Sequence, residues 1–347
     1  MKKRRIELSA ASVTLMLLVI FIHVISECVS GFDHSSVQFA AAISLHRLSS
    51  FAVQGFIFLS GLKLFLKTDG FNLGRFWLGR LRRVVIPYVV AFSIFYIYFI
   101  VRKLVTPSVS GFVGELLRGG LVNHFYFVVI ICQFYLLIPL WRLIVNKASP
   151  ILSLTVSLIL MLILRVYLPE MTKLLFGAEF KYNSRLFTTY LFYFVAGAFA
   201  GKYYDRFKEF LAERKRGIYA LFAVVGLIDC FAVWVIESGR SWLSWADMLH
   251  VLYCIAAILA LMCFSIRITS NDNSAAVKAV RVIDPASYNV YLIHPLFIFM
   301  AESLLHKMGV SSLSLRFVFK FVFTYVLSIG LCVLLDRLKK RIFSKKA

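Results

Sequence analysis

Long apolar runs separated by short polar loops dominate the sequence from residue 8 to residue 335. A helix that crosses a bilayer needs roughly 20 apolar residues, and the runs are continuous, whereas the strands of a membrane barrel alternate apolar and polar positions. The pattern therefore predicts an all-α polytopic membrane helix bundle with about ten transmembrane helices. The expected spans are 8–29, 45–66, 84–105, 121–145, 150–168, 186–201, 217–236, 247–267, 285–305 and 313–335.

Basic residues gather at four places between these spans. They precede the first span and follow the second, the sixth and the tenth, as Lys2–Arg5, Lys67–Arg83, Lys202–Arg216 and Arg337–Lys346. Loops rich in Lys and Arg face the cytoplasm, and the four groups share one side only if the number of spans is even. We therefore expect both termini to be cytoplasmic, with 336–347 as a basic cytoplasmic tail. No small-residue cleavage site follows MKKRR, so the first run is expected to remain as a helix.

The composition supports a single integral-membrane domain over residues 1–347. Of the residues 61% are hydrophobic and 16% are charged, and the mean hydropathy is +0.83. The net charge of +22 lies mostly in the short loops, which indicates membrane topology and contact with membrane lipids and argues against nucleic acid as a partner. The six cysteines are isolated and form no CxxC pair, so we expect neither a metal site nor a redox pair.

The first apolar run, Leu8–Val29, carries two ionisable residues, His23 and Glu27. They stand four positions apart, so they share one face of a helix. Ionisable groups at membrane depth are costly and mark functional sites. The alternative is that His23 packs against a neighbouring helix and Glu27 only reaches the interface.

The stretch before the third span, GRFWLGRLRRVVIPYVV, combines arginines with a proline. Arg80 and Arg83 project from one side of a helix, Arg82 lies between them, and Pro87 favours a kink because it cannot donate to the carbonyl of Arg83. Forked guanidinium groups suit a polyphosphate that enters from the cytoplasm. The alternative is a positive-inside cluster that contacts lipid headgroups.

Three more ionisable residues lie within or beside apolar runs. Arg47, at the outer mouth of the second span, either extends to the interface or contacts a substrate. Asp229, about twelve residues into the seventh span, either pairs with a cation or lines a wet cavity. His294 lies near the middle of the ninth span, directly before Pro295.

Taken together, several segments resemble the membrane acyltransferase 3 family of bacterial glycan O-acyltransferases. They are LMLLVIFIHVISE, FAVQGFIFLSGLKLF, RFWLGRLRRVVIPY, SYNVYLIHP and HFYFVVIICQFYLLIPL, and with the ten-helix count they cover nearly the whole chain. The resemblance implies a multi-pass protein of the bacterial plasma membrane. It also implies transfer of an acyl group, usually acetyl, from cytoplasmic acyl-CoA to a sugar hydroxyl of a lipid-linked or envelope glycan. Acyl-CoA is then a co-substrate, and no permanently bound cofactor is expected.

The same resemblance assigns roles to residues. His23 matches the histidine taken as the catalytic base, and Arg80 and Arg83 match an R-x-x-R pair on the donor side, with Arg82 between them. His294 falls in the YLIH segment, where it could line the substrate path, as could Arg47 and Asp229. One position departs from the family pattern, because Ser12 stands where a basic residue usually precedes the histidine by eleven positions.

The residues themselves fit acyl transfer. A histidine can take the proton of an attacking hydroxyl near neutral pH, and Glu27 could orient its imidazole. About 15 residues of helix place His23 roughly 22 Å from the cytoplasmic end, a span that suits the long arm of CoA. Two other functions stay open: a glycan or lipid exporter on the same helices, and a structural membrane domain in which the ionisable residues only pack.

Overall fold

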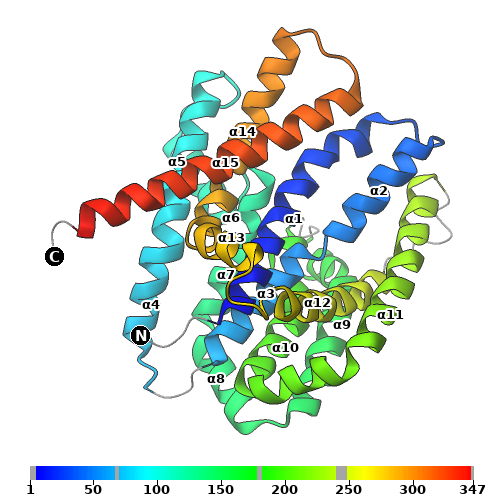
Figure 1. Ribbon diagram of the computed structural model, residues 1–347, viewed down its shortest axis with the longest axis vertical. Coiled ribbons are helices and arrows are strands. Elements are labelled where there is room, and N and C mark those ends of the chain that lie inside the picture. Colours follow the sequence, from blue (N-terminus) through cyan, green and yellow to red (C-terminus); the bar gives the residue numbers. More distant parts are fainter. Residues whose placement is uncertain (1–4, 67–69, 178–181, 240–247, 345–347) are drawn as a thin grey trace. The chain divides into compact units, whose positions relative to one another are not determined.

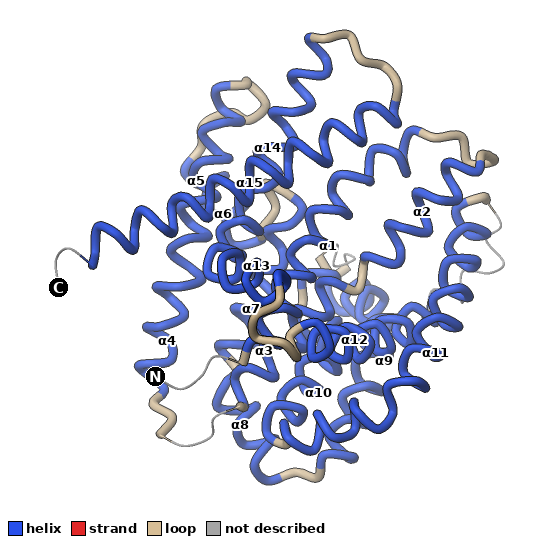
Figure 2. The backbone as a smooth tube through the Cα atoms, viewed as in Figure 1, coloured by secondary structure: helices blue, strands red, loops and turns tan. Residues whose placement is uncertain are grey.

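The computed structural model describes residues 5–66, 70–177, 182–239 and 248–344. Throughout these residues the chain forms helices joined by short loops, and no strand occurs among them (Figure 2). Eight helical segments of the described chain are long and apolar enough to cross a membrane, and three of them join two consecutive labelled helices. The predicted all-α polytopic membrane bundle is confirmed.

The chain divides into two compact units, which are described separately. The first comprises Met1–Phe56 with Lys208–Ala347, and the second comprises Ile57–Phe207. The helices of the first unit are α1 (Ile6–Gly31), α2 (Val37–Ser49), most of α11 (Tyr204–Glu237), α12 (Leu249–Ile268), α13 (Ala275–Ile283), α14 (Ser287–Lys307) and α15 (Leu313–Ser344). The helices of the second unit are most of α3 (Ala52–Phe65), then α4 (Leu73–Arg80), α5 (Ile86–Val101), α6 (Val109–Arg118), α7 (Tyr126–Leu136), α8 (Ile138–Lys147), α9 (Pro150–Phe176) and α10 (Leu191–Lys202).

Helix α1 is the centre of the first unit. It packs against α2, α12, α13, α14 and α15, and α14 runs beside α15 (Figure 1). Small side chains such as Ala10 and Ala11 let neighbouring helices approach closely, while Leu15, Met16 and Ile20 fill the space between them, all fully buried. Because α1 contacts so many helices, its ionisable residues meet protein rather than lipid.

In the second unit, glycines bring α3 and α10 into backbone contact. A Cβ atom on Gly61 would collide with the backbone carbonyl of Phe194, and one on Gly197 would collide with the carbonyl of Phe58. Gly201 meets the carbonyl of Leu62 in the same way. Only glycine permits this separation, so the three positions set the distance between the two helices.

The number of continuous spans is smaller than the ten expected. The structure has eight among its described residues, or nine if α6 and the segment Asn123–Leu136, bent by 59° from each other, count as one span. Two expected spans account for the difference. The stretch 121–145 is interrupted because Pro139 lacks the N–H group that would continue the helix from α7 into α8. The stretch 186–201 holds only the 12-residue helix α10, which is too short to span a membrane. The cytoplasmic placement of both termini stays a prediction.

A π-helical turn lies just before Pro87, where the sequence predicted a kink. Residues Leu81–Val85 lie between α4 and α5, and the N–H group of Ile86 donates to the carbonyl of Leu81, five residues back. Such turns insert one residue into a helix and are frequent at functional sites. Pro87, which has no N–H group to donate, follows directly. The whole segment Leu73–Val101 still passes as one span.

The contact between α3 and α10 predicts that Gly61→Ala and Gly197→Ala lower the free energy of unfolding by about 1–3 kcal/mol each, because an added methyl group forces two backbones apart. Gly79→Ala, in α4 of the same unit, is the control, since no described atom beyond the neighbouring backbone of its own helix lies within 4 Å of its Cβ position. Thermal unfolding in detergent measures the difference. Equal melting temperatures for all three variants would contradict the prediction.

Candidate functional site

Two histidines that are distant in the sequence face each other in the first unit. His23 on α1 and His294 on α14 have ring centroids 5.3 Å apart, with ring planes at 39°. His294 is fully buried. The structure therefore brings the proposed catalytic residue of the first span together with the histidine of the ninth, a pairing that neither segment alone could predict.

The proline that follows His294 accounts for how its ring is held. In a regular helix the N–H group of residue 295 would donate to the carbonyl of Tyr291, but Pro295 has none. The imidazole of His294 takes that place, with Nδ1 2.7 Å from the Tyr291 oxygen. A carbonyl oxygen only accepts hydrogen bonds, so Nδ1 carries the proton and Nε2 of the neutral ring keeps its lone pair. The His-Pro order thus selects one tautomer.

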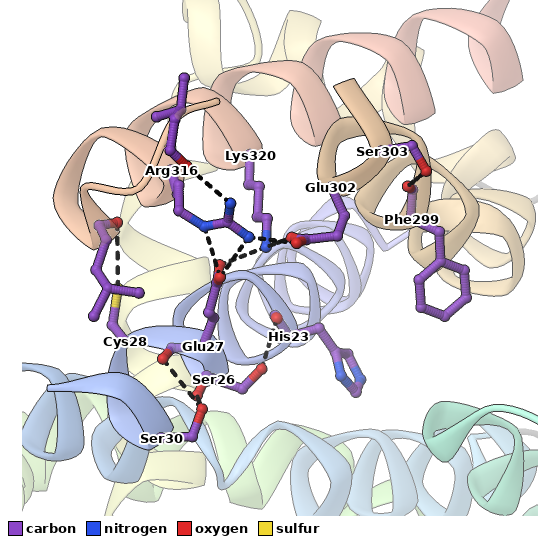
Figure 3. Close-up of polar contacts among 12 residues, drawn as sticks. His23, Ser26, Glu27, Cys28, Ser30, Phe299, Glu302, Ser303, Arg316 and Lys320 are labelled. Atoms are coloured by element: carbon purple, nitrogen blue, oxygen red, sulfur yellow. Dashed lines mark hydrogen bonds and ion pairs between the residues drawn. The ribbon is translucent and has the colours of Figure 1, made fainter. Parts of the chain in front are cut away.

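Glu27 belongs to a cluster of four charged side chains at one end of α1, α14 and α15 (Figure 3). Its carboxylate accepts a hydrogen bond from Arg316 at 2.7 Å and pairs with Lys320. Both cations also pair with Glu302 on α14, so two carboxylates balance two cations. Figure 3 shows the carboxylate of Glu27 directed toward these cations and the ring of His23 directed away from it. Glu27 fixes α1, and so the face that carries His23, to α14 and α15.

Sequence reasoning missed the other three members of this cluster. Arg316 and Lys320 stand four positions apart near the start of the expected tenth span, and Thr324 and Ser328 continue the same spacing along α15. Lys320, Thr324 and Ser328 are all buried. A charged and polar stripe within an apolar span was the available signal, because such residues face protein rather than lipid.

Asp229 and Arg47 form a second buried ion pair. The guanidinium group of Arg47 on α2 donates through Nε and Nη2 to the two oxygens of Asp229 on α11, each at 3.0 Å. The carboxylate is fully buried, whereas the Arg47 side chain is 16% exposed. Of the two possibilities that the sequence left open for Asp229, the structure shows the pairing with a cation.

His250 and Ser50 extend this pair to α12 and to the break between α2 and α3. His250 Nδ1 lies 2.7 Å from the Asp229 carboxylate, and its Nε2 lies 3.0 Å from the hydroxyl of Ser50. That hydroxyl also donates to the carbonyl of Arg47 at 2.7 Å, and the Tyr253 hydroxyl donates to the carbonyl of Leu48. The last carbonyls of a helix have no helical partner, and such groups are costly inside a membrane. The network gives hydrogen-bond donors to the carbonyls of Arg47 and Leu48 at the end of α2, and it connects this end to α11 and α12.

The arginines of the R-x-x-R segment lie in the second unit. Arg80 ends α4, with its guanidinium carbon 5.0 Å from the ring centre of Phe76 and 4.7 Å from that of Tyr135. These cation–π contacts hold Arg80 in place. Arg82 and Arg83 lie in the π-helical turn and are exposed, and no carboxylate of the described chain is within ion-pair distance of them. Two exposed guanidinium groups beside an anchored one are able to bind phosphates.

Two further positions complete the description of the candidate site. Ser12, at the place of the usual basic residue, is buried in α1 and its hydroxyl donates to the carbonyl of Leu8. Within the part of the chain that the structure describes, no group of three or more His, Cys, Asp or Glu side chains is placed to hold a metal ion.

Comparison with known proteins identifies similar chains. The family model described as an acyltransferase domain matches residues 7–337. A protein of Bacillus subtilis (strain 168), provisionally named as a membrane-bound acyltransferase, is 25% identical over 314 residues, which cover 84% of this chain and 80% of the relative. A protein of Staphylococcus aureus (strain MSSA476), provisionally named as a poly-β-1,6-N-acetyl-D-glucosamine export protein, is 24% identical over 310 residues, which cover 86% and 83%. No solved structure matches this chain.

The role of Pro295 can be tested by Pro295→Ala. The new N–H group at position 295 would compete for the Tyr291 carbonyl and release Nδ1 of His294, so the fixed tautomer gives way to a mixture. Nitrogen-15 NMR of labelled histidine distinguishes the two tautomers. Pro169→Ala, which alters the other proline within a long helix, is the control and leaves the His294 signals unchanged. An unaltered His294 tautomer in Pro295→Ala would contradict the prediction.

The buried pair of Arg47 and Asp229 predicts that Asp229→Ala lowers the free energy of unfolding by about 3–5 kcal/mol, because it leaves a largely buried guanidinium group without its carboxylate. The double variant Arg47→Met/Asp229→Leu recovers most of this loss, since it removes both charges. Asp336→Ala is the control: it breaks the ion pair with the exposed Lys340 and costs less than about 1 kcal/mol. Thermal melts of the four proteins test the order, and equal losses for Asp229→Ala and Asp336→Ala would refute it.

Proposed function

The chain belongs to the acyltransferase domain family, and from that membership we propose that it moves an acyl group, acetyl in the first instance, from acyl-CoA to a hydroxyl group of a sugar in an envelope or extracellular glycan. It is a multi-pass membrane acyltransferase. The observation that carries the proposal is the pairing of the half-buried His23 with the fully buried His294 in the first unit. The glycan acceptor is supported by the staphylococcal relative, whose provisional name refers to an N-acetylglucosamine polymer.

In the proposed reaction His23 acts as the general base. One nitrogen of its ring takes the proton of the sugar hydroxyl while the hydroxyl oxygen attacks the thioester carbonyl of acyl-CoA. The new C–O ester bond forms, the C–S bond breaks, and the proton held by His23 passes to the departing sulfur. No oxidant, reductant or further reactant is needed, since an ester and a free thiol replace a thioester and an alcohol.

Two side chains support His23 in this scheme. His294 packs against its ring, and its own tautomer is fixed through the Tyr291 carbonyl, so the neighbour of His23 is held in one protonation pattern. Glu27 is a positioning residue, because it holds the α1 face through Arg316 and Lys320. Preorganised groups of this kind reduce the reorganisation needed when charge develops.

The donor side of the proposal rests on the second unit. Arg80, Arg82 and Arg83 would bind the phosphates of CoA through charge-assisted hydrogen bonds. The ring contacts of Arg80 anchor the segment, and the exposure of the other two leaves their donors available.

Export of a glycan is the second candidate function, and it is favoured by one observation, the provisional name of the staphylococcal relative. An exporter would move its glycan without consuming acyl-CoA. Transport that persists in His23→Ala and without acyl-CoA would favour export, whereas thioester turnover that depends on His23 favours acyl transfer.

The role of His23 predicts that His23→Ala binds acetyl-CoA as the wild type does but loses about 10²–10⁴-fold in transfer, since that is the usual contribution of a general base. Radiolabelled acetyl-CoA and purified protein in nanodiscs, supplied with acceptor glycan, measure both quantities. His306→Ala, which alters an exposed histidine of α14, is the control and keeps its activity. Full activity in His23→Ala would rule out its role as the base.

The proposed role of the arginines predicts a change in the KM for acetyl-CoA rather than in kcat. Arg80→Gln/Arg83→Gln raises the KM for acetyl-CoA more than tenfold while kcat changes little, because phosphate contacts contribute binding in both the ground and transition states. Arg75→Gln/Arg102→Gln removes the same charge at the two ends of the same span and serves as the control. Equal KM values in the two double variants would show that general positive charge, rather than this pair, attracts the donor.

A further inference from the structure

A basic cavity of about 480 Å³ lies in the first unit between the start of α11 and the end of α12. None of its lining residues belongs to the His23–His294 pair, the Glu27 cluster or the Asp229 network. Lys208, Lys215, Arg216 and Arg267 contribute four positive charges to its wall. No carboxylate is present among the described residues that line it. None of the proposed catalytic steps uses this cavity.

The cavity is built from one face of each helix. On α11 the lining residues are Lys208, Leu211, Ala212, Lys215, Arg216 and Tyr219. On α12 they are Cys263, Ile266 and Arg267, and Ser270 follows just after the helix. Their spacing of three and four positions places each set along a single helix face. The thiol of Cys263 lies 3.7 Å from the carbonyl of Leu211, which holds the two faces together.

The charges in the cavity are not neutralised by the protein. The acidic residues of this part of α11, which are Asp205, Glu209 and Glu213, are absent from the lining. No carboxylate of the described chain lies within ion-pair distance of Lys208, Lys215, Arg216 or Arg267. Four cations that converge on one cavity repel each other, and an anion that enters it relieves the repulsion.

Most of the remaining wall is apolar, and this limits the kinds of anion that would fill the cavity. Leu211, Ile266 and Tyr219 line the cavity beside the cations. Beyond Tyr219, α11 continues as a helix that is long and apolar enough to span the membrane. A ligand that carries both a phosphate headgroup and hydrocarbon chains matches a cavity with cationic and apolar walls. A wholly polar anion would leave the apolar wall uncovered.

We propose that this cavity, the α11–α12 basic pocket, binds the headgroup of an anionic phospholipid whose acyl chains begin against Leu211, Tyr219 and Ile266. Basic pockets between helices at the membrane boundary are a known way of binding anionic lipid headgroups. The site stands apart from the proposed acyl transfer and does not depend on it.

Binding of dihexanoyl phosphatidylglycerol to the purified full-length protein, measured by native mass spectrometry, tests the proposal. Dihexanoyl phosphatidylcholine has the same chains and a zwitterionic headgroup, so it is the matched ligand control. We expect the wild type to prefer phosphatidylglycerol at least tenfold, and to lose this preference as the salt concentration rises.

Variants then locate the site. Lys215→Gln/Arg267→Gln weakens phosphatidylglycerol binding about 30-fold, since each cation near an anionic headgroup contributes a factor of about five. Arg206→Gln/Arg214→Gln removes the same charge from positions of α11 outside the lining and leaves binding within about twofold of the wild type. The single variant Arg267→Gln, which weakens binding about fivefold, serves if the first double variant does not fold.

Three results would overturn the proposal. Equal binding of the two lipids would show that the headgroup is not recognised, and equal weakening by the two double variants would show that only the overall charge matters. Displacement of phosphatidylglycerol by free CoA at matched concentration would assign the pocket to the phosphates of the donor. Acetyl transfer measured on the same samples reports separately on the proposed function.

Discussion

Charges inside the membrane must be paired within the protein, and this requirement determines much of how the first unit is assembled. A carboxylate or guanidinium group that loses water in a medium of low dielectric constant is costly unless an opposite charge is close. Glu27 and Asp229 each meet this demand through cations on other helices. Each pair therefore fixes the rotation of the helices that carry it. His23 lies one turn from Glu27 on α1, so its placement depends on the same pairing.

The helical fold was largely predictable, because a continuous apolar run of suitable length indicates a membrane-spanning helix. The runs that became single spans needed no knowledge of their neighbours. The prediction was less accurate where a local feature interrupts an apolar run. Pro139 divides the expected fourth span, and Gly119 adopts a left-handed conformation, with φ at 62°, between α6 and Asn123. Mean hydropathy averages over many positions, so it does not register single residues such as these. The expected span was therefore long and apolar enough although the helix is broken within it.

The candidate site was only half predictable, for a physical reason. The cost of an ionisable group in a membrane marks His23, Glu27, Asp229 and His294 from the sequence alone. Their partners come from tertiary structure. Arg47 is 182 residues from Asp229, and Arg316 is 289 residues from Glu27, so no local pattern joins them. Periodicity along the tenth span could have drawn attention to Lys320, but only the packing of α15 on α1 shows which carboxylate it meets.

The π-helical turn at Leu81–Val85 has a consequence for how this chain can vary. One surplus residue in a helix advances every later side chain by about 100° relative to a regular α-helix. Removing one residue from the turn would therefore return the segment to ordinary helix and rotate Arg80 by about 100° about the helix axis relative to α5, with no change to either flanking sequence. A one-codon deletion in this turn would act as a switch of helix phase. If the deleted residue is Val84, the arginine segment changes the direction in which it faces but keeps all of its charge.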